Sequence, residues 1–222
     1  SSAASDVYKR QYMSYQDFKY YEPKEQRLNK VCFITSNKKF TRGHRDRVNF
    51  ANKILKNHID LIDIYGNGYN PIDDKLEVLS KYKYVFAIEN GLCMDYWTEK
   101  LADSYLAGCH PIYYGCPNIS DYFEQDSMTK VNIRDYNGTI NTIKDIIERD
   151  VFSTSREAVL TARNQVLDEY NMFNLIANEV SKIDSYNYLI EKMSLPEIIY
   201  PMKYNLKDLV LYKLARLFNI VL

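Results

Sequence analysis

Aromatic and charged side chains gather at the predicted start of one helix, residues 98–107. Tyr96, Glu99 and Lys100 stand close together there, and Thr98 or Asp95 suits the N-cap position. Free N–H groups and the positive end of the helix dipole favour phosphate at such a point. Lys100 would add a full positive charge, Glu99 an acceptor for sugar hydroxyls, and Tyr96 a ring to pack on a base or sugar. The chemistry indicated is binding of a phosphorylated, hydroxyl-rich ligand.

A second positive charge is available at the start of another predicted helix, residues 45–56. Arg47 could supply a guanidinium that binds phosphate through two hydrogen bonds. Arg42 and Arg45 are near it, and the alternative for Arg47 is a surface salt bridge. His44 could also touch a phosphate, or be a solvated loop histidine.

Glu89 and Asn90 stand at the end of an apolar run, residues 84–88. Glu89 is either a ligand contact or a buried, hydrogen-bonded end of the strand, and the sequence leaves both open. Trp97 is expected in the core, and residues 118–123 as a short helix that supports the pocket.

Short apolar runs alternate with amphipathic segments along the first two thirds of the chain. Runs at 30–35, 58–64, 84–88 and 110–114 read as strands, and segments at 45–56, 73–82 and 98–107 as helices. This alternation predicts an α/β, Rossmann-like parallel sheet that helices cover on both faces. Ligands bind such sheets at the carboxyl ends of the strands. Helices are also expected at 139–149, about 153–170, 172–183 and 206–218.

Composition narrows the class of protein. Lys plus Arg and Asp plus Glu both number 29, so no net field favours nucleic acid, and any anion site must be local. The four cysteines show no metal-ligand spacing and are expected to be buried free thiols rather than disulfides. No signal peptide and no run of about 20 apolar residues is seen. We therefore expect a cytoplasmic enzyme.

The phrase from Ile88 to Phe123 resembles the signature of glycosyltransferase family 10, the α-1,3/1,4-fucosyltransferases. The matching elements, in order, are Glu89-Asn90, Tyr96-Trp97-Thr98-Glu99-Lys100, Leu106-Ala107-Gly108 and Pro111-Ile112-Tyr113-Tyr114-Gly115. Upstream, Ser36-Asn37 with Arg47-Val48-Asn49-Phe50, and Asp63-Ile64-Tyr65-Gly66, resemble two further stretches of the family. The resemblance covers roughly residues 30–150, the family's C-terminal donor-binding domain, which implies the C-terminal half of a GT-B type glycosyltransferase with a helical C-terminal tail.

The resemblance implies inverting transfer of fucose from GDP-fucose to a glycan hydroxyl, on a bacterial surface polysaccharide or another glycan. Arg47 and Lys100 would hold the diphosphate. Glu99 and Tyr96 would contact the nucleotide and fucose, and Asn90 would line the pocket. The family's general base lies in an N-terminal acceptor domain that is not recognisable here, so the catalytic residue is unknown. No metal and no cofactor is assigned. The alternatives are a different nucleotide-sugar donor and a non-catalytic sugar-nucleotide-binding module.

The domain prediction has four parts. Residues 1–11 resemble translated adaptor sequence, a non-native artefact, so we expect the native protein to begin upstream. Residues 12–29 are a linker or a remnant of the acceptor domain, residues 30–185 are the GDP-sugar donor-binding domain, and residues 186–222 are the tail. Its amphipathic helix either lies peripherally on the inner face of a membrane or packs on the acceptor domain.

Overall fold

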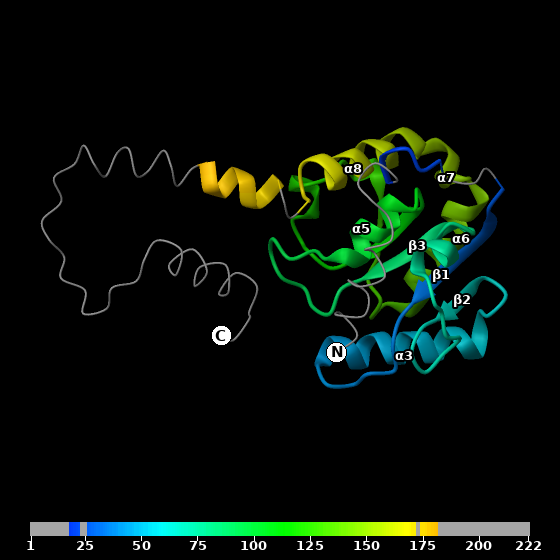
Figure 1. Cartoon of the computed structure of the whole chain (residues 1–222). Helices are drawn as coiled ribbons and strands as arrows, with labels where there is room; N and C mark the ends of the chain where they lie inside the picture. The colour runs from blue at the N-terminus through cyan, green and yellow to red at the C-terminus, as the bar shows by residue number, and fades with distance from the viewer. Residues whose placement is uncertain (1–17, 23–25, 172–173, 182–222) are drawn as a thin grey trace, which may run out of the picture. The chain divides into compact units, whose positions relative to one another are not determined.

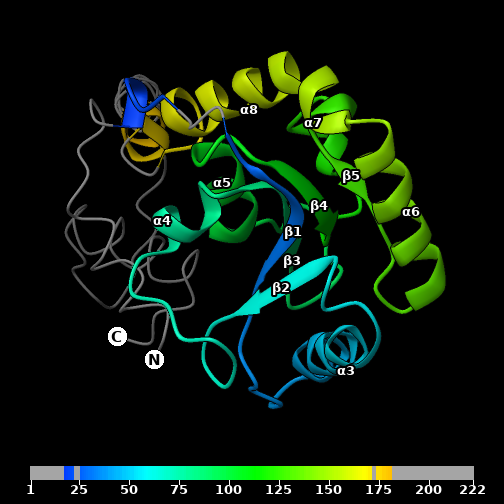
Figure 2. The ribbon, with the colours of Figure 1, turned by 90° about the vertical axis from the view of Figure 1, so that its right-hand side faces the viewer.

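The computed structural model describes residues 18–22, 26–171 and 174–181. Their centre is a five-stranded, all-parallel sheet (Figure 1), in the order β2-β1-β3-β4-β5, with all strands labelled in Figure 2. The strands are β1 (Leu28–Ile34), β2 (Ile62–Tyr65), β3 (Tyr82–Ile88), β4 (His110–Tyr114) and β5 (Thr129–Lys130). Every residue of β4 is buried and almost every residue of β3, which is why these strands read as continuous apolar runs. The predicted parallel α/β sheet is confirmed.

Helices cover both faces of the sheet (Figure 2). α3 (Arg42–Asn57) and α6 (Tyr136–Glu148) pack on one face, where Phe50 and Ile54 meet Phe33 and Phe86 in the core. The other face carries α4 (Lys75–Leu79), α5 (Glu99–Leu106) and α8 (Arg156–Asp168). The short α7 (Val151–Thr154) lies between α6 and α8 in the chain. Burial of both faces supplies the main free energy that holds the sheet together.

The sequence predicted the position of most elements and misjudged several ends. α5 lies within the predicted range, but α3 begins earlier, at Arg42, because Thr41 caps it. The predicted helix at 73–82 shortens to α4, since Asp74 caps its start and Tyr82 pairs within the sheet. The single helix expected near 153–170 is two, α7 and α8. The two-residue strand β5 was not predicted, because so short a run carries no periodicity.

The chain divides into two compact units, Ser1–Leu175 and Ile176–Leu222. The sheet belongs to the first, and of the second only residues 176–181 are described, as part of a helix. The predicted tail and its helix at 206–218 lie outside the described residues, so the domain boundaries stay predictions. None of the described helices has the length and apolar character needed to cross a membrane. All four cysteines are free, as predicted. The predicted burial is confirmed for Cys32, Cys109 and Cys116 and is wrong for Cys93, which lies exposed in the loop after β3.

β1 lies between β2 and β3 in the sheet, so β2 is added on one side of β1 and the later strands are added on the other side. The chain leaves β1 for α3 on one face of the sheet, and leaves β3 for α5 on the other face. The segments after these two adjacent strands therefore diverge at the carboxyl ends of the strands, which is the point where open α/β sheets bind ligands. The beginnings of α3 and α5 flank this point from opposite faces.

Candidate functional site

The start of α3 lies directly against the segment that follows β3. A Cβ atom added to Gly43, in the first turn of α3, would lie 1.6 Å from the carbonyl oxygen of Asn90. Only a residue without a side chain allows these two backbones to approach so closely. The close approach brings Arg47, one turn further along α3, to the same sheet edge as Glu89 and Asn90.

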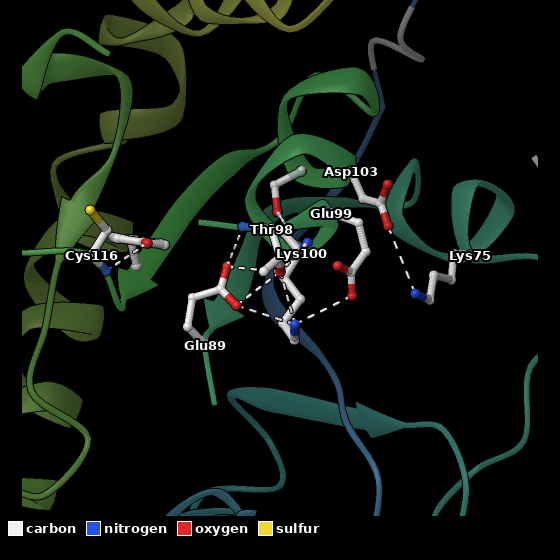
Figure 3. Close-up of polar contacts among 9 residues, drawn as sticks. Lys75, Glu89, Thr98, Glu99, Lys100, Asp103 and Cys116 are labelled. Carbon is white, nitrogen blue, oxygen red and sulfur yellow. Dashed lines mark hydrogen bonds and ion pairs between the residues drawn. The ribbon is translucent and has the colours of Figure 1, made fainter. Parts of the chain in front are cut away.

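Glu89 is a buried carboxylate that fixes the start of α5 (Figure 3). Its side chain has no exposed surface. Oε1 accepts a hydrogen bond from the backbone N–H of Thr98 at 2.8 Å, and the Thr98 hydroxyl lies 2.9 and 2.8 Å from the two carboxylate oxygens. Thr98 is the N-cap of α5, whereas Asp95, the other cap candidate, is not. An intramolecular carboxylate therefore already occupies one of the N–H donors that the sequence offered to phosphate.

Lys100 connects this buried carboxylate to the surface. Its Nζ lies 3.2 Å from Oε2 of Glu89, 2.9 Å from the Thr98 hydroxyl oxygen and 3.3 Å from Oε1 of Glu99. The Glu99 side chain is 42% exposed and that of Lys100 is 22% exposed. Burial raises the pKa of the Glu99 carboxyl. The charge of Lys100, together with hydrogen bonds from Thr98 and Lys100, outweighs burial and brings that pKa below its usual value. Lys100 thus has one partner inside the protein and one that solvent or ligand can replace.

Arg47 carries a guanidinium that is largely withdrawn from water. The residue is only 6% exposed, and its Nε has no hydrogen-bond partner in the described part of the chain. Burial lowers the pKa of the guanidinium, and the charges of Glu89 and Glu99 only partly offset this effect. The surface salt bridge considered for Arg47 is not what the structure shows.

The hydroxyl of Tyr96 interacts electrostatically with the four charged side chains of the site. Burial raises the pKa of Tyr96, the carboxylates of Glu89 and Glu99 raise it further, and Lys100 and Arg47 oppose them. The side chain is 39% exposed. Asn90 is half-buried, and its Oδ1 is buried with no partner among the described residues. All six predicted binding residues therefore meet at one edge of the sheet, and their contacts with a ligand stay predictions.

The loop between Asn90 and Tyr96 is held in an unusual conformation. Asp95 has a φ of 58°, which is rare for a residue with a side chain. Its carboxylate accepts hydrogen bonds from Asn118 Nδ2 and the Tyr122 hydroxyl, both at 2.7 Å, and its N–H donates to Asn118 Oδ1. The short 3-10 helix Ile119–Asp121 lies in the segment predicted to support the pocket. Trp97, expected in the core, packs edge-on against the ring of Phe123.

His44 has a structural role that the sequence did not predict. It is the third residue of α3, where its N–H donates to the Thr41 hydroxyl and its ring Nδ1 lies 3.2 Å from the Thr41 backbone nitrogen. Burial lowers the pKa of His44, and the nearby charges of Arg47, Lys38 and Lys100 lower it further. A neutral imidazole therefore caps α3 beside several cations.

Gly66 and Gly115 belong to the stretches that resemble the family, but the close contacts that these glycines allow at this edge were not predicted. A Cβ on Gly66, after β2, would lie 2.0 Å from the Thr35 carbonyl oxygen, and a Cβ on Gly115, after β4, would lie 2.5 Å from Cγ of Glu89. The signal was present, since both glycines directly follow apolar strands. Thr35, at the end of β1, adds another buried oxygen, Oγ1, that has no partner among the described residues.

The arrangement can bind a ligand with adjacent negative charges and hydroxyls. Two cations from opposite faces of the sheet, Arg47 and Lys100, converge on it, and Glu99 and Asn90 supply hydrogen-bond acceptors. Within the described residues, no group of three His, Cys, Asp or Glu side chains could hold a metal ion.

The part of the chain that contains this edge matches known proteins. Residues 24–152 match the family described as "Glycosyltransferase family 10 (fucosyltransferase) C-term". The chain is 30% identical over 129 residues to Alpha-(1,3)-fucosyltransferase B of Drosophila melanogaster, covering 55% of this chain and 28% of that protein. It is 29% identical over 145 residues to Alpha-(1,3)-fucosyltransferase FucT of Helicobacter pylori, covering 65% and 27% respectively. The chain thus matches about a quarter of the length of these relatives.

Among solved structures, the chain is similar to an alpha1,3-fucosyltransferase crystallised with GDP-fucose. The sequence identity is 20% and the TM-score is 0.48, covering 69% of this chain and 51% of the other.

Proposed function

This chain belongs to glycosyltransferase family 10, and from that premise we propose that it forms the donor-binding half of an inverting fucosyltransferase. The donor would be GDP-fucose and the acceptor a hydroxyl group of a glycan. An acceptor hydroxyl, deprotonated by a base outside the described residues, would attack the anomeric carbon of fucose while the bond to GDP breaks. The membrane contact of the tail and a bacterial surface polysaccharide as acceptor remain parts of this proposal.

The observation that carries the proposal is the buried guanidinium of Arg47, which interacts with the same two carboxylates, Glu89 and Glu99, as Lys100 does. A buried cation whose Nε lacks a partner costs free energy unless an anion compensates it. A nucleoside diphosphate would supply two adjacent negative charges at this point. As GDP leaves, negative charge accumulates on its terminal phosphate, and cations placed there lower the barrier.

In this proposal each further residue has a defined task. Glu99 would exchange its ion pair with Lys100 for hydrogen bonds to ribose or fucose hydroxyls, because it is the exposed partner of that lysine. Tyr96 would pack on the sugar or the base, and Asn90 would offer its unpartnered Oδ1 to a hydroxyl.

The direct test is calorimetric titration of the chain with GDP. We expect Lys100→Ala and Arg47→Ala each to weaken GDP binding by about tenfold to a hundredfold, the range for a lost charge-assisted hydrogen bond. Matched controls are Lys81→Ala and Arg149→Ala, which remove the same charges from exposed ion pairs with Glu77 and Asp145. Circular dichroism would establish that each variant is folded. Unchanged GDP affinity in both site variants would refute the site assignment.

The two alternatives need separate experiments. A panel of GDP- and UDP-sugars, followed by nucleotide release, would reveal a donor other than GDP-fucose. The second experiment joins upstream coding sequence to the chain until it reaches the length of its relatives. A non-catalytic binding module would then still bind GDP without transferring a sugar. Turnover with that sequence and not without it would identify the chain as half of an enzyme.

A further inference from the structure

We propose that Glu89 is a positioning residue that acts on the donor through Lys100 and does not touch it. The inference rests on the proposed function, because the donor that Lys100 would bind is the one proposed above. It assigns to Glu89 an indirect role, as the internal partner that sets where the ammonium group of Lys100 lies.

Burial and hydrogen bonding leave Glu89 no free edge for a ligand. Its side chain is fully buried, and both oxygens face donors of this chain. Oε1 has the Thr98 N–H, Oε2 has Nζ of Lys100, and the Thr98 hydroxyl can donate to either oxygen in turn. A ligand at the surface would meet Lys100 first, since the lysine lies between Glu89 and the exposed carboxylate of Glu99.

The position of Glu89 is itself fixed from behind. A Cβ at Gly115 would lie 2.5 Å from Cγ of Glu89 and 2.4 Å from the hydroxyl oxygen of Tyr113. That hydroxyl is held in turn by the Cys116 N–H at 2.8 Å. The Glu89 side chain therefore packs against the backbone that follows β4, and this contact leaves the carboxylate little room to move.

The Thr98 hydroxyl connects Glu89 with Lys100. It accepts from Lys100 Nζ at 2.9 Å while donating to Glu89, so one hydroxyl ties the cap of α5 to both charged groups. A single buried carboxylate thus sets the start of α5 and the direction of its first lysine. Loss of the Glu89 charge would leave Lys100 with only the exposed Glu99 as an anionic partner, and it would pair there in competition with phosphate.

The test is a double-mutant cycle on GDP affinity with Glu89→Gln, Lys100→Met and the double variant. Gln keeps the size of Glu and an oxygen for the Thr98 N–H but has no charge for Lys100. We expect Glu89→Gln to weaken GDP binding by about tenfold in the parent chain, and by less than about twofold once Lys100 is Met. A role confined to stability would give equal effects in both backgrounds.

Matched controls and a second variant keep every outcome informative. Glu77→Gln with Lys81→Met forms the same cycle on an exposed ion pair of 3.0 Å between α4 and the residue before β3, and should leave GDP affinity unchanged. If Glu89→Gln does not fold, Glu89→Asp, which keeps the charge but shortens its reach, is placed in the same cycle. Equal weakening in both Lys100 backgrounds would overturn the positioning role alone. Absence of GDP binding by the parent chain would overturn the proposed function, and this inference with it.

Discussion

At the scale of single residues, the two cations of the site are held in opposite ways. Lys100 is paired with two carboxylates, and one of these, Glu99, is exposed and replaceable. Arg47 is buried, with an Nε that has no partner in the described part of the chain and a pKa lowered mainly by burial. In the proposed function, the buried guanidinium of Arg47, whose charge Glu89 and Glu99 compensate only in part, would favour an anion, and Lys100 would set where the anion lies.

Gly115 gives a residue-scale prediction. Gly115→Ala should lower the free energy of unfolding by about 1–3 kcal/mol, the usual cost of an extra methyl group in a filled space. The added Cβ would meet Glu89 and Tyr113, both buried and hydrogen-bonded, so GDP binding should weaken as well. Urea denaturation and GDP titration measure the two effects. Gly91→Ala, whose Cβ would meet nothing within 4 Å, is the control, and equal denaturation midpoints for the two variants would contradict this account.

At the scale of elements, the site depends on how two helices begin. α3 follows β1 and α5 follows β3, on opposite faces of the sheet, so their first turns flank one point at the sheet edge. Each start has its own cap, Thr41 with His44 for α3 and Thr98 with Glu89 for α5. The α3 cap is local in sequence, whereas the α5 cap recruits a residue from the preceding strand end.

Gly43 tests the contact of α3 with that strand end. Glycine to alanine within a helix normally stabilises by up to about 1 kcal/mol. Here the new Cβ would lie 1.6 Å from the Asn90 carbonyl oxygen, so α3 or the end of β3 must shift. We expect Gly43→Ala to lower the free energy of unfolding by about 1–3 kcal/mol in urea denaturation. The control, Asn52→Ala at an exposed position of α3, should be neutral or stabilising, and a similar gain at Gly43 would refute the close contact.

At the scale of the whole molecule, one buried histidine connects distant parts of the chain. His110, at the start of β4, is 1% exposed. Its Nδ1 lies 2.8 Å from the hydroxyl of Ser155, between α7 and α8, and its Nε2 lies 2.8 Å from the hydroxyl of Thr129 in β5. The edge strand β5 and the start of α8 are thereby tied to the central sheet.

This histidine makes stability depend on pH. Burial lowers the pKa of His110 from 6.5 to about 4, so the unfolded chain binds a proton that the folded chain does not. Stability from neutral His110 is complete above pH 6.5 and is lost as the pH falls from 6.5 to about 4, by up to about 3 kcal/mol. Urea denaturation of the parent and His110→Gln across this range should show the difference between them narrowing towards low pH. Parallel curves would rule out this contribution.

The sequence alone determined the parallel α/β class, most element positions and the residues that gather at the sheet edge. Patterning suffices for this, because the buried strands are continuous apolar runs and the motif from Glu89 to Gly115 is contiguous. The match to glycosyltransferase family 10 agrees with that prediction.

Only the tertiary structure decided how those residues relate to one another. Whether Glu89 faces ligand or protein depends on Thr98 and Lys100 folding back over it, and on the space left by Gly115. Arg47 is buried because α3 begins at Arg42, directly after its cap Thr41, and Gly43 rests on Asn90. Such contacts join segments that are distant in sequence, and periodicity and spacing carry no information about which side chain reaches which.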